Sequence, residues 1–223
     1  MYSVKIRLAP TGTMLFFQTL QIAVCQSVIF KASKSLFLLV QMFYFRGMKN
    51  ILMVLASETF RDIEFLVPKA FFEQAGWTVQ TASSKKESVG RFGYKVQNDF
   101  LLEEVSADSF NGIYFVGGKG ALEYLDNDVA KKLFETFLEQ GKPVAAICAA
   151  PKNFLKWGLL KGKNATGNNS GQEFQHMAEE YGATPYLLES VVVDGLILTA
   201  SGPEASEESA NKYIELLNNH TFC

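Results

Sequence analysis

Short apolar runs alternate with amphipathic stretches from Met48 onward, and this alternation limits the possible folds more than any other feature of the chain. The apolar runs have the length of buried strands, and the stretches between them carry apolar residues at helical spacing. Strands that alternate with helices predict βαβ units, a mostly parallel sheet and helices on both faces of that sheet. The expected strands are Ile51–Ala56, Trp77–Ala82, Gly112–Val116, Val144–Ile147, Val191–Val193 and Leu196–Ala200.

Amphipathic stretches between these strands predict the helices. The most regular of them is expected to be capped by Asp126, to carry Val129 and Leu133 on its apolar stripe, and to end at Gly141. Residues 57–61, between the first strand and the first helix, are expected to form a loop. The expected helices are Asp62–Ala75, Asp126–Gln140, Ala149–Trp157, Glu173–Tyr181 and Ser206–Asn218.

Residues 1–47 differ in composition from the rest of the chain, because they hold five cations and no acid. Their apolar runs, at residues 14–17, 22–25 and 36–40, are all shorter than a membrane span. We expect an N-terminal apolar extension that is either a leader with a targeting or interfacial role or the product of a mis-assigned start. Met48 would then begin a single domain over residues 48–223.

The remaining residues are net negative, since 16 Lys and Arg residues stand against 23 Asp and Glu residues. This charge repels phosphate backbones, so we expect no nucleic-acid partner, and we expect no membrane association for residues 48–223. Three cysteines without a Cys-x-x-Cys motif, and only two histidines, predict neither a disulfide framework nor a metal site. We expect a cytoplasmic protein that uses no cofactor.

Cys148 directly follows the expected strand Val144–Ile147 and directly precedes a helix. Ligand sites of open parallel sheets lie at the carboxyl ends of strands. The thiol would face the unpaired amides at the start of that helix, so we expect a lowered pKa. The small residues Ala149 and Ala150 permit the sharp turn of a nucleophile elbow. A buried and inert thiol is the alternative, and the position at a strand end favours the reactive one.

Two further features are expected at the same edge of the sheet. Glu64 is the one charge within the apolar run after Asp62, and partial burial would raise its pKa so that it could share a proton with a thiolate. The alternative is a helix-terminal glutamate that is stabilised by the dipole alone. Gly117 and Gly118 follow another expected strand, where bare backbone amides can stabilise an oxyanion, although such a pair also forms ordinary turns.

Histidine is scarce, and a catalytic Cys–His pair needs an imidazole within hydrogen-bond reach of the sulfur. His176 is expected on the solvent-exposed side of a helix, and His220 lies in the C-terminal tail with Cys223. Cys25 and Cys223 are expected to be incidental. Histidine-dependent catalysis is therefore not predicted.

Four motifs occur along the chain: Ala145-Ala146-Ile147-Cys148-Ala149-Ala150-Pro151, Glu64 four residues before Pro68, Val116-Gly117-Gly118, and Asp194-Gly195-Leu196-Ile197-Leu198-Thr199-Ala200-Ser201-Gly202-Pro203. Taken together, these motifs resemble those of the ThiJ/PfpI family. The resemblance runs in order from about Lys49 to Asn218. It implies an α/β fold: a flavodoxin-like three-layer sandwich with a mostly parallel sheet, similar to class I glutamine amidotransferases. It also implies a protein that is usually a homodimer.

The resemblance also implies a reactive cysteine at Cys148, a carboxylic acid at Glu64, and backbone amides of Gly118 and Ala149 around the sulfur. Activities of the family include glyoxalase and deglycase action on reactive carbonyls, proteolysis, chaperoning and the response to peroxide. Two departures argue against a histidine-dependent triad. Ala149 stands where the protease-like branch has histidine, and Asn168 stands where the deglycase branch typically has one.

The leading hypothesis is a cofactor-free enzyme of glyoxalase or deglycase type, whose partner is a small-molecule carbonyl substrate. Cys148 would attack the carbonyl, Glu64 would shuttle the proton, and the pocket formed by Gly117, Gly118 and Ala149 would stabilise the oxyanion. The alternative is a redox-responsive stress protein or chaperone that uses oxidation of Cys148. A peptidase or amidase ranks third, because the family histidines are missing.

Overall fold

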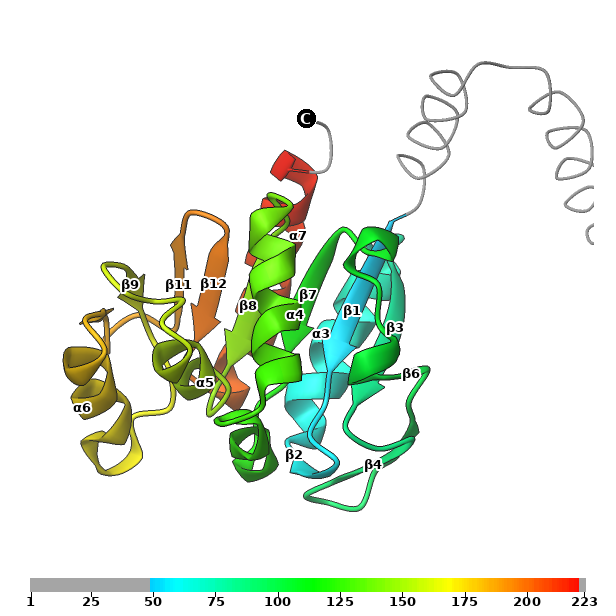
Figure 1. Ribbon diagram of the computed structural model, residues 1–223, viewed down its shortest axis with the longest axis horizontal. Helices are drawn as coiled ribbons and strands as arrows, with labels where there is room; N and C mark the ends of the chain where they lie inside the picture. Colours follow the sequence, from blue (N-terminus) through cyan, green and yellow to red (C-terminus); the bar gives the residue numbers. More distant parts are fainter. Residues whose placement is uncertain (1–48, 221–223) are drawn as a thin grey trace, which may run out of the picture. The chain divides into compact units, whose positions relative to one another are not determined.

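The computed structural model describes residues 49–220, so the predicted extension over residues 1–47, Cys25 and Cys223 lie outside the described residues. A seven-stranded sheet with the strand order β11-β12-β8-β7-β1-β3-β6 forms the centre (Figure 1). Every neighbouring pair is parallel except β11 with β12, which confirms the predicted mostly parallel sheet. The strands are β1 (Asn50–Val54), β3 (Thr78–Ser83), β6 (Phe100–Leu101), β7 (Gly112–Phe115), β8 (Val144–Ile147), β11 (Val191–Asp194) and β12 (Ile197–Ala200).

Helices cover both faces of this sheet, as Figure 1 shows. On one face α3 packs beside α7, and on the other α4 and α5 pack with α6 at their side. The arrangement is the three-layer α/β sandwich that the sequence predicted. The helices are α3 (Asp62–Gln74), α4 (Asp128–Glu139), α5 (Pro151–Lys156), α6 (Glu173–Glu180) and α7 (Ser206–His220).

The apolar strands explain why two helix layers are needed. In β1, Leu52 and Val54 join the core on the α4 side, whereas Ile51 and Met53 join the core formed with α3 and α7. All four side chains are fully buried. Because alternate residues of a strand point to opposite faces, an uninterrupted apolar strand is stable only when both faces are covered.

The chain between β1 and α3 was expected to be a loop, but part of it forms a strand, β2, of a second small sheet. The carboxylate of Asp62, at the start of α3, accepts hydrogen bonds from the N–H groups of Phe92 (3.0 Å) and Tyr94 (3.2 Å). These bonds fix the hairpin of this small sheet against the first turn of α3. The small sheet consists of β2 (Glu58–Phe60), β4 (Glu87–Gly90) and β5 (Lys95–Gln97).

Short elements make up the remainder of the described structure. They are the paired strands β9 (Asn164–Ala165) and β10 (Thr184–Pro185), and the 3₁₀ turns η1 (Leu102–Glu104), η2 (Ala107–Ser109), η3 (Lys119–Tyr124), η4 (Ser170–Gln172) and η5 (Pro203–Ala205). Between residues 49 and 220, no helix has both the length and the apolar character needed to cross a membrane.

Two predicted details of α4 are wrong. Asn127 caps the helix in place of Asp126, because its side-chain oxygen accepts a hydrogen bond from the N–H of Ala130 at 2.9 Å. Asp126 instead forms an ion pair with Lys156 at 2.6 Å. Val129 was expected on the apolar stripe but is 47% exposed, since the helix turns Ala130 toward the sheet and leaves Val129 at the edge of the buried face.

Candidate active site

Cys148 occupies the turn between β8 and α5, at the carboxyl end of a central strand. Its φ angle is 62°, in the left-handed region that residues other than glycine rarely adopt. Such strain costs about 1 to 3 kcal/mol and persists where the surroundings fix it. Here the Cys148 N–H donates to the carbonyl oxygen of Ala200 (2.8 Å), and the Asn168 N–H donates to the Cys148 carbonyl oxygen (2.7 Å). The predicted elbow is present, with α5 beginning at Pro151 instead of Ala149.

Glu64 lies in the first turn of α3, and its side chain is completely buried. Neither carboxylate oxygen makes a hydrogen bond of standard geometry with the described residues. The Cys148 thiol and the Gly117 N–H are nonetheless close enough to stabilise the charged carboxylate and to oppose the rise of its pKa. The structure therefore brings Glu64 and Cys148 together in a polar contact that is looser than an ideal hydrogen bond.

Gly117 and Gly118 follow β7 and adjoin both side chains. A β-carbon at Gly117 would collide with the Glu64 carboxylate and would lie 2.7 Å from the β-carbon of Cys148. Gly118 has a φ angle of 106°, and a β-carbon there would overlap the backbone that leads into α3. Glycine is therefore required at both positions. The N–H groups of Gly118 and Ala149 lie close enough to the Cys148 sulfur to favour its thiolate.

Burial controls the ionisation of Cys148 and Glu64. Removal from water, partly opposed by Cys148 and by the positive charge of Arg61, raises the pKa of Glu64 to about 7. Burial and the adjacent Glu64 raise the pKa of Cys148 to about 12, against the lowering effect of the Gly118 and Ala149 amides. The predicted rise for Glu64 is confirmed. The predicted lowering for the thiol is wrong, because the amides at the elbow do not offset burial beside a carboxylate.

The two groups together hold one proton across a wide pH range. The first proton leaves near neutral pH, from about 7 upward. The second is retained up to about pH 12, since its loss would put two negative charges in contact in a buried site. The single negative charge resides mainly on Glu64, the more acidic of the two groups, and a shift of the thiol proton to the carboxylate gives a minor form with the charge on sulfur, where the amides stabilise it. Such a pair can supply a thiolate and a carboxylic acid at the same time.

The histidines lie away from this pair. His176 is exposed on α6, as predicted, and His220 is exposed at the end of α7. Asn168, where a histidine of the deglycase branch would stand, contacts the elbow through its backbone, while its side-chain oxygen accepts a hydrogen bond from the Ser170 N–H (3.2 Å). Within residues 49–220, no three His, Cys, Asp or Glu side chains are grouped so as to hold a metal ion.

Sequence reasoning missed three residues that shape the site. The charge of Arg61 opposes the rise in the pKa of the buried carboxyl, and the charge of Glu204, on η5, adds to it. Asn153 is fully buried on α5, and its Nδ2 donates to the carbonyl oxygens of Ala121 (3.1 Å) and Ala150 (3.2 Å). The sequence could have indicated Arg61 and Glu204, because Arg61 lies three residues before Glu64 and Glu204 directly follows the motif that ends at Pro203. The contact of Asn153 with η3 depends on tertiary packing and had no local signal.

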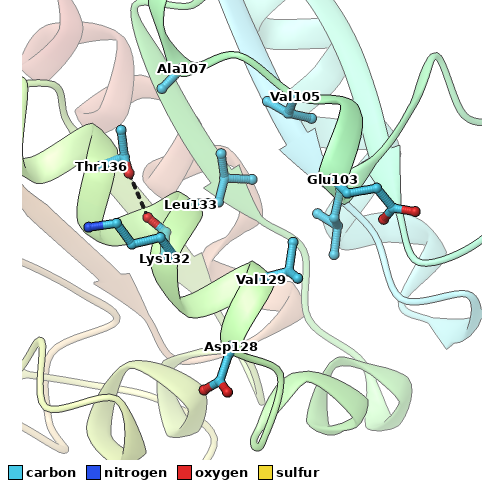
Figure 2. Close-up of a pocket in the computed structure, with 9 residues that line it drawn as sticks. Glu103, Val105, Ala107, Asp128, Val129, Lys132, Leu133 and Thr136 are labelled. Carbon is cyan, nitrogen blue, oxygen red and sulfur yellow. Dashed lines mark hydrogen bonds between the residues drawn. The ribbon is translucent and has the colours of Figure 1, made fainter.

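A separate surface groove lies between α4 and residues 102–107, as Figure 2 shows. Val105, Val129 and Leu133 give it an apolar lining, and Glu103 and Asp128 add acidic groups at its border. No cysteine lines it, and none of the residues around the elbow does. The candidate active site is therefore the elbow and not this groove.

Similarity to known proteins extends over most of the chain. A sequence model of the DJ-1/PfpI family matches residues 49–216. An uncharacterised protein of Methanocaldococcus jannaschii is 38% identical over 162 residues, covering 71% of this chain and 78% of that protein. Deglycase PfpI of Pyrococcus furiosus is 27% identical over 167 residues, covering 74% and 98%. Glutathione-independent glyoxalase DJR-1.2 of Caenorhabditis elegans is 29% identical over 170 residues, covering 76% and 89%.

Among solved structures, a ThiJ/PfpI domain protein from Brachyspira murdochii is similar at a TM-score of 0.73 and 31% identity. The match covers 78% of this chain and 99% of that one. The likeness confirms the predicted flavodoxin-like fold.

Proposed function

The chain belongs to the DJ-1/PfpI family, and from this premise we propose that it is a cysteine-dependent enzyme of glyoxalase or deglycase type that acts on small reactive carbonyls. The observation that carries the proposal is the contact between the strained Cys148 and the buried, raised-pKa Glu64. Relatives named as a deglycase and as a glyoxalase support the class of substrate. Catalysis would need no cofactor.

In the first step, the Cys148 thiolate attacks the aldehyde carbon of a 2-oxoaldehyde such as methylglyoxal. A carbon–sulfur bond forms, and the carbonyl electron pair moves onto oxygen, where the N–H groups of Gly118 and Ala149 stabilise the charge. Protonated Glu64 then transfers its proton to this oxygen. The product is a neutral hemithioacetal beside a carboxylate, so the step begins from the one-proton state of the pair.

In the second step, the Glu64 carboxylate removes the proton from the carbon bonded to sulfur and returns it to the neighbouring carbon. The hydroxyl proton of the hemithioacetal passes to the oxygen of the second carbonyl, which becomes a hydroxyl group, and the hemithioacetal carbon becomes the carbonyl carbon of a thioester. Water then cleaves the thioester, which releases a 2-hydroxy acid and restores the Cys148 thiol. The overall reaction adds one water molecule to the 2-oxoaldehyde and requires no external oxidant or reductant.

A second candidate function is a redox-responsive stress protein or chaperone. Two molecules of hydrogen peroxide would oxidise the Cys148 thiolate to a sulfinate and would themselves be reduced to water. Protonated Glu64 favours this reading, because it could donate a hydrogen bond to a sulfinate oxygen. After mild peroxide treatment, an intact mass without two added oxygens on Cys148 would count against it.

A peptidase or amidase remains the third candidate. Ala149 follows the cysteine directly, and Asn168 meets the elbow through its backbone N–H. Neither supplies the imidazole that activates a cysteine for amide cleavage. We therefore rank this candidate below the carbonyl and peroxide reactions.

We also propose that residues 48–223 form one domain of a cytoplasmic homodimer, with residues 1–47 as an extension. The family resemblance supports the dimer. Sedimentation equilibrium of the full chain should give the mass of two chains, and the mass of one chain would contradict this proposal.

Turnover of methylglyoxal tests the proposed enzyme. The full chain, Cys148→Ser and Glu64→Gln would be incubated with methylglyoxal, and loss of aldehyde and formation of lactate would be followed. We expect turnover by the wild type, none by Cys148→Ser, and a loss of at least about 100-fold in Glu64→Gln. His176→Gln, on an exposed helix face, serves as the control and should retain full activity. A wild type that makes no lactate would refute the glyoxalase reaction.

A further inference from the structure

Two arginine side chains lie close to one exposed aromatic ring near the start of α3. The guanidinium carbon of Arg61 lies 5.7 Å from the ring centroid of Phe92, and that of Arg91 lies 5.8 Å from the same centroid. Phe92 is 73% exposed, at the turn of the β4–β5 hairpin. A phenyl ring close to two cations is an apolar surface with positive charge beside it.

Neither guanidinium group has an anionic partner. Among residues 49–220, the side chains of Arg61 and Arg91 make no ion pair and no hydrogen bond, and the Arg61 Nε is buried without an acceptor. On the same hairpin, by contrast, Lys95 is paired with Glu87 at 3.3 Å. Two unpaired guanidinium groups near one ring concentrate positive charge, and an anion bound beside the ring would offset that charge and accept hydrogen bonds from their N–H groups.

Backbone hydrogen bonds hold this cluster at the border of the candidate active site. The Arg61 N–H donates to the carbonyl oxygen of Gly117 (2.9 Å), and the Arg91 N–H donates to the carbonyl oxygen of Phe60 (2.8 Å). The charge of Arg61 also acts on Glu64, three residues further along the chain. The cluster is therefore held, through Arg61, against the turn after β7, where Gly117 adjoins both Glu64 and Cys148.

The geometry points to a ligand with a single carboxylate. A guanidinium group matches the two oxygens of a carboxylate, and the Phe92 ring offers contact to a short aliphatic segment beside it. The negative charge of Glu204 acts on Glu64, and negative charge on these two residues disfavours a doubly charged group such as a phosphate monoester. A monoanionic ligand fits the local charge better.

We propose that Arg61, Arg91 and Phe92 form a carboxylate-binding subsite, and that the preferred substrate is a 2-oxoaldehyde whose carboxylate lies a few bonds from the reacting carbonyl. The proposal rests on the carbonyl chemistry proposed for Cys148 and names the substrate class of that site. Arg61 and Arg91 would bind the end of the substrate that does not react.

A matched pair of substrates tests the subsite. 4,5-Dioxopentanoate and its methyl ester carry the same 2-oxoaldehyde group and differ in the charge of the far end. We expect kcat/KM for the acid to exceed that for the ester by at least about tenfold, mainly through KM. Arg61→Gln and Arg91→Gln should each reduce this ratio toward one. The control Lys161→Gln removes an exposed cation that lies outside the cluster and should keep the ratio.

A binding measurement separates failure of the subsite from failure of the proposed reaction. 4-Oxopentanoate and its methyl ester, which cannot undergo the isomerisation, would be tested as protectants of Cys148 against iodoacetamide. Protection by the acid only, lost in Arg61→Gln, would support the subsite even if methylglyoxal is not turned over. Equal protection by acid and ester would overturn the subsite even if methylglyoxal is turned over. Protection by inorganic phosphate as strong as by the acid would also overturn the assignment to a carboxylate.

Discussion

The carboxylate of Glu64 and the thiol of Cys148 are in contact beside Gly117, where a β-carbon would collide with both residues. The helix α3 supplies the acid, the β8–α5 turn supplies the sulfur, and the glycine after β7 keeps the space between them open. Three segments far apart in the sequence therefore have to be placed correctly for one polar contact.

Gly117→Ala should inactivate the protein, because the added methyl group must displace Glu64 or Cys148. A displacement of about 1 Å can cost about 100-fold in rate, and we expect at least that loss in kcat/KM for methylglyoxal. Gly141→Ala is the matched control, since a β-carbon there meets no atom within 4 Å at a φ angle of 69°. It should lose about 1 kcal/mol of stability and keep its turnover. Full activity in Gly117→Ala would contradict the assigned contact.

Glu64→Gln should stabilise the fold at alkaline pH even though it impairs turnover. The folded-state pKa of about 7 lies above the ordinary value of 4.5, so the folded protein binds this proton more tightly than the unfolded chain does. The stability from this proton is fully present below about pH 4.5 and is lost as the pH rises through 7. The difference amounts to at most about 3 kcal/mol. Urea unfolding at about pH 5 and about pH 8 should show a larger gain for the variant at the higher pH.

Equal effects of Glu64→Gln at the two pH values would contradict the raised pKa. The mutation would then act through packing alone, since packing does not depend on protonation over this range. Wild-type stability that increases between these pH values would contradict it as well.

Glu204→Gln should lower the pKa of Glu64, because the negative charge of Glu204 contributes to its rise. The alkylation rate of Cys148 by iodoacetamide, measured against pH, should then reach its midpoint at a lower pH than in the wild type. Glu207→Gln, an exposed acid on α7 that does not act on Glu64, is the control and should leave the midpoint in place. A midpoint that moves upward in Glu204→Gln would exclude this electrostatic contact.

The position of Cys148 could be predicted from the sequence because its signal is local. An apolar run ends directly before it, and Ala149 and Ala150 leave room for a tight turn. Its contact with Glu64 is not local, since it depends on the order of β1, β7 and β8 in the sheet and on the side that α3 covers. From the residues alone Glu64 was a lone charge in an apolar run that could share a proton with a thiolate, and the family resemblance placed this acid beside Cys148.

The thiol pKa was predicted in the wrong direction for a related reason. The start of a helix can be located from the sequence, whereas the loss of solvent around Cys148 is caused by atoms from several distant segments. The short helix α5 also begins three residues after the cysteine, at Pro151. Desolvation and Glu64 therefore outweigh the amides that the sequence could indicate.

Asn153 should act as a positioning residue, since its Nδ2 joins the carbonyl oxygens of Ala121 on η3 and Ala150 beside the elbow. Asn153→Asp would place oxygen against both carbonyl groups in a fully buried site, and we expect a loss of about 3 kcal/mol. Alkylation of Cys148 by iodoacetamide should slow at temperatures well below unfolding, because the Gly118 and Ala149 amides would separate. Asn218→Asp, exposed on α7, is the control. Unchanged alkylation with a lowered melting temperature would reduce Asn153 to a purely structural role.

The pH dependence of methylglyoxal turnover tests most directly whether Cys148 and Glu64 act as a pair that shares one proton. We would measure kcat/KM from about pH 5 to about pH 10 for the wild type and for Glu64→Gln. We predict a wild-type profile that rises with a midpoint near 7 and then stays level, since the second proton leaves only near 12. In Glu64→Gln the rise should move to higher pH. A wild-type midpoint near the ordinary cysteine pKa of about 8.5, unchanged in Glu64→Gln, would contradict the shared proton.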